Sequence, residues 1–312
     1  MTAGELALQE LVCSITKKRT GMKAMEAAPS CLCSTIGRVP NTVSSKDELA
    51  VVSLASGSTG NATFIHCGHQ NILIDAGISF RRIDKGLRAL GYTIYDLDGV
   101  FITHEHSDHI SAIPMLLKKT DLPIYTTKGT WQAIGEKVSA YEHRFIQLCR
   151  RNVIGNIAVN PFSISHDAAN PVGYTICGQG KKITLATDLG FITDEVRMAM
   201  DDSDILILEA NHDVEMLRYG PYPLALQNRV LSNRGHLSNE CAGWALVNMR
   251  RPSGIQVILA HRSQQNNTPQ LALATVTEIV RDNGIVVGSD MMIQLAQEQQ
   301  MVKCVAKEDD NL

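Results

Sequence analysis

Three histidines and two acidic residues stand within seven consecutive positions, in the segment THEHSDH at 103–109. His104 and His106 are two positions apart, so both imidazoles point the same way if the backbone stays extended after the apolar run before them. These two side chains can then bind one metal ion. Asp108 and His109 follow where the chain turns into a helix, and they can face a second ion. The spacing alone predicts two metal ions.

Three other apolar segments each end in a residue that can bind the same kind of ion. FSISH ends in His166, ITLATD ends in Asp188 and VILAH ends in His261. A single histidine after a strand is more often a surface or capping residue, but several such ends together favour a dinuclear centre. Imidazole nitrogen and carboxylate oxygen suit zinc or manganese, and a hydrolytic centre keeps one position open for water.

The elements that must position these residues begin at residue 49. Short apolar strands dominate the start of each half of the chain and helices its end, which favours an α/β fold of two β-rich sheets packed face to face with helices outside. We expect the catalytic domain to span 49–297 and to be followed by a C-terminal tail at 298–312. Residues 1–48 have no such pattern, and we expect a poorly ordered N-terminal extension apart from a short helix near Glu5 to Lys17.

Composition limits the class of protein less than the motifs do. The net charge of -3 gives no global attraction to nucleic acid, although a local basic patch is compatible with it. The eight cysteines form no CxxC pair, which indicates reduced thiols and a cytoplasmic location. The sequence contains neither the residue order of a signal peptide nor an apolar run long enough for a membrane span, so we expect no membrane partner.

The HxHxDH string with its later histidine, aspartate and histidine resembles the metallo-β-lactamase superfamily, over roughly residues 50 to 297. The resemblance implies an αββα sandwich of two mixed β-sheets with helices on the outer faces and the metals at one sheet edge. Glu105 matches a variable position and is expected to point away from the metals. The implied ligands are His104, His106 and His166 for the first ion, Asp108, His109 and His261 for the second, and Asp188 as the bridge.

Two further segments resemble the nuclease-type members of this superfamily. LILEANHD places Glu209 and His212 after a strand, and RGHLSNE places His236 just before a helix. A phosphodiester-cleaving enzyme needs a proton donor for the leaving alkoxide and further donors for the phosphoryl oxygens. The resemblance therefore implies that His236 is catalytic and binds substrate, that Glu209 orients it, that His212 binds substrate and that Asp108 helps to orient the nucleophile. Alternatively, His236 merely precedes a helix capped by Ser238.

The strings SLASGSTGNATFI, GPYPLALQNRVLSNRGHLSN and AHRSQQNN are similar to the YycJ/WalJ subgroup, bacterial proteins with 5′-to-3′ exonuclease activity on double-stranded DNA. This similarity implies that the SGSTGN loop lies near the metals, where Ser56, Ser58 and Asn61 would bind a phosphate. The loop could instead be a tight hairpin that needs its glycines. Arg262 and Gln265 depart from the pattern of the subgroup, which affects the expected contacts with substrate.

The expected function is therefore that of a dinuclear metal-dependent phosphodiester hydrolase, most specifically a DNA exonuclease in DNA repair or processing. Three alternatives stay open: a small-molecule or RNA phosphodiesterase, an acyl or thioester hydrolase of the same fold, and a non-catalytic metal-bound regulatory module. The sequence leaves zinc or manganese, and the formation of a homo-oligomer, undecided.

Overall fold

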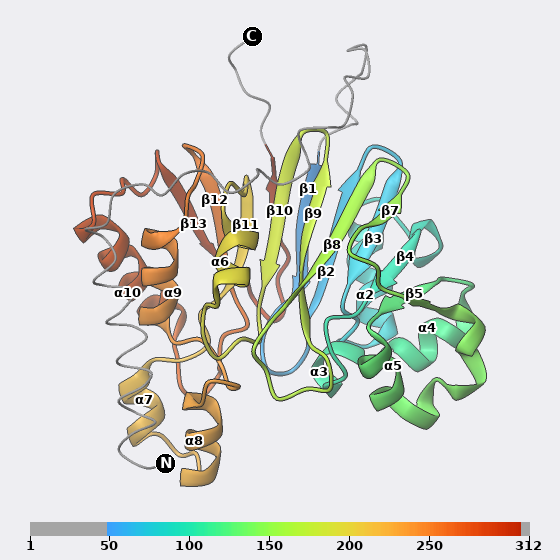
Figure 1. Ribbon diagram of the computed structural model, residues 1–312, viewed down its shortest axis with the longest axis horizontal. Helices are drawn as coiled ribbons and strands as arrows, with labels where there is room; N and C mark the ends of the chain where they lie inside the picture. The colour runs from blue at the N-terminus through green and yellow to red at the C-terminus, as the bar shows by residue number, and fades with distance from the viewer. Residues whose placement is uncertain (1–48, 307–312) are drawn as a thin grey trace.

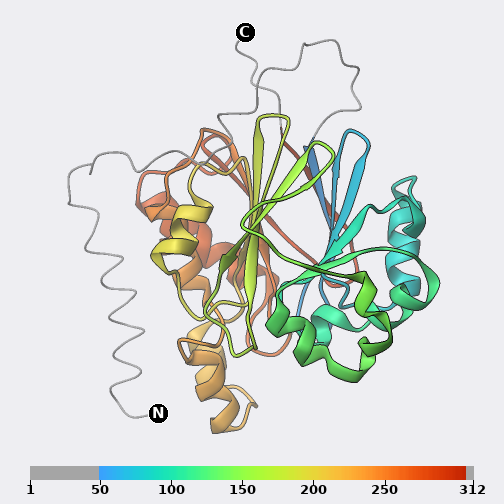
Figure 2. The ribbon, with the colours of Figure 1, turned by 45° about the vertical axis from the view of Figure 1, so that its right-hand side comes forward.

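The computed structural model describes residues 49–306, which form two seven-stranded β-sheets packed face to face with helices on both outer sides (Figures 1 and 2). The predicted αββα sandwich is confirmed. The helix expected near Glu5 to Lys17 lies outside the described residues. None of the helices within 49–306 is long and apolar enough to cross a membrane.

The first sheet has the order β14-β1-β2-β3-β4-β5-β6. Its strands β3 to β6 run parallel, so the residues that follow β3 and β4 meet at one edge. Part of the segment expected to be a C-terminal tail belongs to this sheet, because β14 pairs antiparallel with β1. The strands are β1 (Leu49–Ala55), β2 (Ala62–Cys67), β3 (Gln70–Ile74), β4 (Gly99–Phe101), β5 (Ile124–Thr126), β6 (Phe145–Gln147) and β14 (Val302–Val305).

The second sheet has the order β13-β12-β11-β10-β9-β8-β7. Its strands β10 to β13 run parallel, which brings the carboxyl ends of β10, β11 and β12 to one edge. Ligands bind at such an edge in many α/β proteins. The strands are β7 (Asn152–Ile154), β8 (Ile157–Ser163), β9 (Val172–Gly178), β10 (Lys181–Ala186), β11 (Ile205–Glu209), β12 (Ile255–Ala260) and β13 (Met291–Leu295).

The helices cover the outer faces of both sheets. Helices α2, α4 and α5 lie against the first sheet, and α6, α9 and α10 lie against the second (Figure 1). The α-helices are α2 (Phe80–Ala89), α3 (Ser107–Ile110), α4 (Ile113–Lys119), α5 (Lys128–Ile134), α6 (Asp194–Met200), α7 (Val214–Tyr219), α8 (Leu224–Leu231), α9 (Asn239–Asn248) and α10 (Pro269–Asp282). Short 3-10 helices are η3 (Ile94–Asp96), η4 (Gly135–Lys137) and η5 (Ser139–Arg144).

The central core lies between the two sheets, and both contribute to it. Ile65 and Phe101 from the first sheet and Tyr174 and Ile207 from the second belong to one buried cluster. Most strand positions are buried on both faces, which explains why the strands are continuous apolar runs rather than alternating patterns. This rigid sandwich fixes the strand ends that carry the polar side chains.

Candidate metal centre

Seven side chains that can bind a metal meet where the two sheets share an edge. Four come from the first half of the chain, after β4 and in α3, and three follow β8, β10 and β12 of the second sheet. In each of three overlapping groups of these side chains, the atoms that could bind a metal lie within 4.8 Å of one another. The groups are His104, His106 and His166; Asp108, His109 and His261; and His104, His109 and Asp188.

In the first group, two imidazoles face each other across a gap suited to a cation. Nε2 of His166 lies 3.2 Å from Nδ1 of His106. Nε2 of His104 is buried and has no hydrogen-bond partner among the described residues, while its Nδ1 lies 2.9 Å from the Thr103 hydroxyl. Burial lowers the pKa of His104 well below its ordinary value, and the neighbouring imidazoles of His109 and His166 lower it further. His104 is therefore neutral, which is the form that binds metals.

In the second group, each imidazole is oriented by a buried carboxylate on its far side. Nε2 of His109 lies 3.3 Å from Oδ2 of Asp108, and its Nδ1 lies 2.8 Å from Oδ2 of Asp75. Likewise, Nε2 of His261 lies 3.5 Å from Oδ2 of Asp108, and its Nδ1 lies 2.7 Å from Oε1 of Glu209. Carboxylates in this position fix the ring and raise the basicity of the nitrogen that faces a metal.

The charge of the carboxylates around the imidazoles of the second group outweighs the effect of burial on their pKa values. Burial alone would lower the pKa of His109 and His261, but carboxylates, first of all Asp188, raise both pKa values well above the ordinary range. The same imidazoles hold the pKa of Asp188 well below its usual value, although burial alone would raise it. Without a metal, His109 and His261 are therefore favoured in their protonated form. Their positive charge lies where a bound cation would lie.

Asp188 lies between the two groups. Its Oδ1 is 3.3 Å from Nε2 of His261, and its Oδ2 is 3.5 Å from Nε2 of His109. Its Oδ2 is buried without a hydrogen-bond partner among residues 49–306. Together with the unpartnered Nε2 of His104 and the opposed imidazoles of the first group, this atom provides donors of the kind that bind a divalent cation. The donors present therefore fit two divalent ions, with Asp188 between them.

The backbone is strained at this edge. Asp75, Asp188 and His261 adopt left-handed φ angles of 59°, 60° and 52°, which non-glycine residues rarely do. Such strain persists only where the surroundings enforce it, and it gathers at functional sites. Asp75 and His261 directly follow β3 and β12, and Asp188 stands two residues after the end of β10. The unusual backbone conformation therefore occurs at the strand ends that carry these side chains.

Glu209 and His236 form a pair beside the metal-binding groups. Nδ1 of His236 donates to Oε1 of Glu209 over 2.8 Å, and Oε2 of Glu209 accepts backbone N–H groups of Leu189 and Leu237. Burial alone would raise the pKa of Glu209, but His236 and His261 lower it to about 2. Glu209 is thus a buried, ionised acceptor that fixes His236. Ser238 also caps α9, as the alternative interpretation of this segment expects.

The SGSTGN loop packs against the same edge. Oγ of Ser56 accepts the backbone N–H of His261, and Nδ2 of Asn61 lies 3.2 Å from Nε2 of His109 and 3.4 Å from Oδ2 of Asp108. Ser58 is exposed. The loop therefore lies near the expected metals, but Ser56 and Asn61 contact the metal-binding residues themselves.

Other residues singled out in the sequence lie apart from the groups. His212 is completely buried, and neither ring nitrogen has a hydrogen-bond partner among the described residues, so a direct contact with a polymer is not available to it. Glu105 accepts the backbone N–H of Ala169 over 2.7 Å and belongs to none of the groups. The Arg262 guanidinium donates to the carbonyls of Ser263 and Asn267, and Gln265 is exposed.

Two residues that contact members of the metal-binding groups, Asp75 and Arg234, were not predicted from the sequence. Asp75 directly follows the apolar strand β3, and the same signal identified Asp188 after β10. Arg234 donates from Nε and Nη2 to the carbonyl oxygen of His166. It stands two residues before His236, but an isolated arginine in a loop carries no spacing signal.

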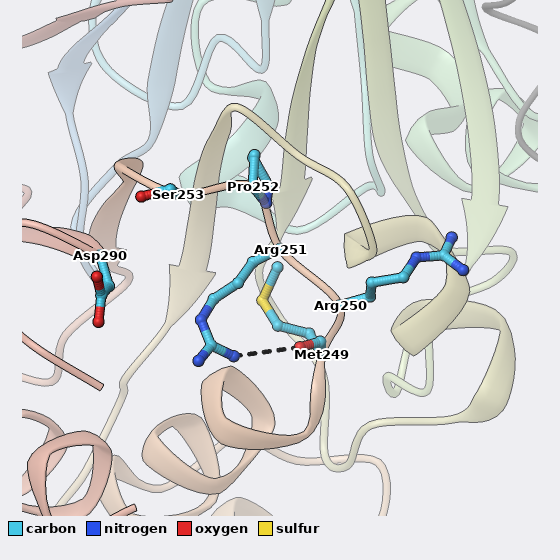
Figure 3. A pocket seen from close by; sticks show the side chains of 6 residues that line it. All are labelled: Met249, Arg250, Arg251, Pro252, Ser253 and Asp290. Atoms are coloured by element: carbon cyan, nitrogen blue, oxygen red, sulfur yellow. Dashed lines mark hydrogen bonds between the residues drawn. The ribbon is translucent and has the colours of Figure 1, made fainter. Parts of the chain in front are cut away.

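A shallow pocket of about 390 Å³ lies at the other end of β12 from His261. It is lined by Met249, Arg250, Arg251, Pro252, Ser253 and Asp290 (Figure 3). Arg250 is paired with Asp202, and Arg251 donates to the carbonyl of Met249. This basic pair therefore stands at the end of the sheet remote from the metal-binding residues.

Comparisons with known proteins agree with this architecture. The family model of the beta-lactamase superfamily domain matches residues 70–261. Exodeoxyribonuclease YycJ of Bacillus anthracis is 36% identical over 238 residues, which cover 75% of this chain and 90% of that protein. Exodeoxyribonuclease WalJ of Streptococcus pneumoniae is 34% identical over 245 residues, 77% of this chain and 91% of that protein.

Among solved structures, the metallo-β-lactamase fold protein YhfI from Bacillus subtilis aligns with a TM-score of 0.60 and 17% identity, over 82% of this chain and 100% of that chain. The fold and the clustered histidines and aspartates define a metal-dependent hydrolase. More closely, the chain belongs to the YycJ/WalJ family of the metallo-β-lactamase superfamily.

Proposed function

We propose that the protein is a dinuclear metal-dependent exonuclease that degrades double-stranded DNA in the 5′-to-3′ direction, in DNA repair or processing. The observation that carries this proposal is the contact between Glu209 and His236 beside the metal-binding groups. The relatives at 34–36% identity are exodeoxyribonucleases by name, and the chain covers about nine tenths of their length. The names of these relatives support DNA as the polymer. The double-stranded substrate and the 5′-to-3′ direction rest on the resemblance of the sequence motifs to the YycJ/WalJ subgroup.

We assign the two ions to the side chains that the geometry groups together. Zinc or manganese bound there would lower the pKa of a water molecule toward 7 and neutralise the phosphoryl oxygens. The proposed ligands are His104, His106 and His166 for one ion, Asp108, His109 and His261 for the other, and Asp188 for both.

Side chains of the protein supply the proton for the leaving group and orient the attacking water. Glu209 fixes Nδ1 of His236, which leaves Nε2 of that ring to hydrogen bond or protonate the leaving oxygen. Oδ2 of Asp108, between the imidazoles of His109 and His261, can orient the attacking water. The exposed hydroxyl of Ser58 can donate to a phosphate of the bound strand.

An acyl or thioester hydrolase of the same fold is less well supported. A thioester leaves as a thiolate, which needs little help from a proton donor, whereas an alkoxide needs one. The Glu209–His236 pair would therefore have no catalytic role in a thioesterase. A regulatory module without turnover would need neither that pair nor the strained ligand backbone.

The test uses purified protein and end-labelled single- and double-stranded DNA and RNA, with manganese, zinc or a chelator. We expect mononucleotide release from the 5′ end of double-stranded DNA with metal, and no release with chelator or with His106→Ala. Faster hydrolysis of a thioester than of bis(p-nitrophenyl) phosphate, with all four nucleic acids left intact, would contradict the proposal.

A further inference from the structure

The chain between Glu209 and His236 forms a projecting arm, residues 213–235, which contains α7 and α8. Both views show these helices beyond the ends of the sheets, at the end where α3 lies (Figures 1 and 2). The arm is anchored on both sides: the N–H of Asp213 donates to the Asn266 carbonyl, and the N–H of Asn239 donates to the His212 carbonyl. The arm therefore leaves and rejoins the fold beside the proposed catalytic pair.

The arm has a small core of its own. Leu217, Val230 and Leu231 form a buried cluster distinct from the other three clusters, and Tyr222 and Leu226 pack against it. Pro221 and Pro223 restrict the turn between the two helices, because the proline ring fixes the φ angle. The arm thus has a buried cluster and a restricted turn of its own, which give it a defined shape.

The tip of the arm, residues 219–224 around the turn between α7 and α8, is apolar and exposed, and Gly220 within it lies close to Asn266 of the loop after β12. Tyr219 is 84% exposed and Leu224 is 71% exposed. These are the two most exposed of the large hydrophobic residues within 49–306. They flank the turn, in which Pro221 and Pro223 are exposed as well. Large apolar side chains that are exposed close together in the sequence suit a place of interaction. An aromatic ring with a free face can stack on any nucleobase, independent of sequence.

The base of the arm carries a cation without a carboxylate partner. Arg234 is exposed and donates to the carbonyl oxygen of His166, a member of the first metal-binding group. No carboxylate within the described part of the chain pairs with its guanidinium, whereas Arg229 is bound by Asp167. A guanidinium has five N–H donors, so those that the carbonyl leaves unused can bind a phosphate.

We propose that the arm is the surface that holds the nucleic-acid strand at the centre. Arg234 binds a phosphate next to the scissile bond, and Tyr219 and Leu224 contact the bases of the same strand further out. This inference rests on the proposed function and adds the residues that hold the polymer. We favour nucleic acid as the occupant, because Arg234 offers free guanidinium donors to a phosphate beside a metal-binding residue and Tyr219 offers an exposed aromatic ring to a base on the same arm.

The experiment measures the Kd of metal-free protein for a short fluorescent DNA duplex. We expect the double variant Tyr219→Ala/Leu224→Ala to raise the Kd about tenfold, as the loss of one stacked base does. Arg234→Ala should raise it about tenfold and make binding less dependent on salt, and Arg234→Lys should restore part of both. Tyr95→Ala is the matched control, since Tyr95 is 67% exposed but stands in η3, before β4, at the far end of that strand from His104. Its Kd should stay within about twofold of wild type.

Three results distinguish failure of this inference from failure of the proposed function. Cleavage of DNA by the wild type, with unchanged Kd in the double variant, would overturn this inference and leave the proposed function intact. Absence of any nuclease activity in the wild type would overturn the proposed function itself. Light scattering of the wild type and the double variant measures self-association. If the double variant changes self-association but leaves the Kd for DNA unchanged, the tip binds a second copy of the chain and the inference is wrong. Circular dichroism of each variant checks that the fold is retained.

Discussion

The hydroxyl oxygen of Ser56 accepts a hydrogen bond of 2.8 Å from the backbone N–H of His261, 205 residues further along the chain. His261 has a left-handed φ of 52°, and the Asn211 amide donates to its carbonyl oxygen over 2.8 Å. Glu209 holds its imidazole. These contacts fix one orientation of His261, and we therefore propose Ser56 as a positioning residue for this ligand.

Ser56→Ala should weaken the binding of one metal ion by about tenfold, because residues that orient a ligand typically contribute 10- to 100-fold to affinity. The variant would leave the buried N–H of His261 without its acceptor. Competition with a fluorescent chelator measures the two affinities. Ser289→Ala, an exposed serine in the loop before β13, is the control. Two unchanged affinities in Ser56→Ala would show that the contact does not position the ligand.

Glu209→Gln should lower the turnover of DNA by about 10²- to 10⁴-fold, the usual contribution of a positioned proton donor. The amide keeps the shape of the side chain but removes the carboxylate acceptor from one of the two imidazoles that Glu209 orients. The pH profile of kcat is the informative measurement, because a purely structural role would lower activity equally at all pH values. Full activity at every pH would remove Glu209 from the mechanism.

Gly77→Ala should destabilise the fold by about 3 kcal/mol or more, as severe overpacking does. A Cβ at Gly77 would lie 1.5 Å from the carbonyl oxygen of Asp108, because the SGSTGN loop, Gly77 and the metal-binding motif pack backbone against backbone. Gly91→Ala is the matched control: its Cβ meets nothing within 4 Å, and its φ of +86° costs only about 1 kcal/mol. Urea unfolding measures both, and equal midpoints would refute the close approach.

His212 should make the metal-free protein lose stability in acid. Burial lowers its pKa from 6.5 to about 3, so the unfolded chain takes up the proton first, and stability falls as the pH drops from about 6.5 toward about 3. Between about pH 7.5 and about pH 5 this side chain accounts for roughly 2 kcal/mol. His212→Leu should therefore reduce the difference in unfolding free energy between these two pH values by that amount. An identical difference in both proteins would show that His212 is not buried in neutral form.

The strand ends could be predicted from the sequence because long apolar runs identify buried strands, and residues that can bind a metal stand one to three positions after them. His166, Asp188 and His261 follow this rule, and the structure brings all three to one edge. The contact between Ser56 and His261 could not be predicted in this way. This contact depends on how a loop of the first sheet packs against the end of a strand in the second sheet. Local sequence patterns do not predict which distant segments pack together.

Short helices and strands were the other features that could not be predicted from the sequence. β7 has three residues, α7 has six, and neither length shows a period. β14 lies beyond the segment that resembles the superfamily, and its pairing with β1 depends on the whole sheet rather than on its own four residues. Helix α7 and the exposed residues of the arm were therefore not predicted from the sequence and became visible in the structure.

The central claim is that the clustered histidines and aspartates hold two divalent ions that the cleavage of DNA requires. Asp188→Ala tests it most directly, because Asp188 lies between both groups. Metal content by mass spectrometry and release of label from 5′-labelled duplex DNA are measured on the same preparation, with the fold checked by circular dichroism. We predict close to two ions per chain and rapid release for the wild type, and fewer ions with release at least about 10³-fold slower for the variant. Undiminished release by a folded Asp188→Ala protein would contradict the account.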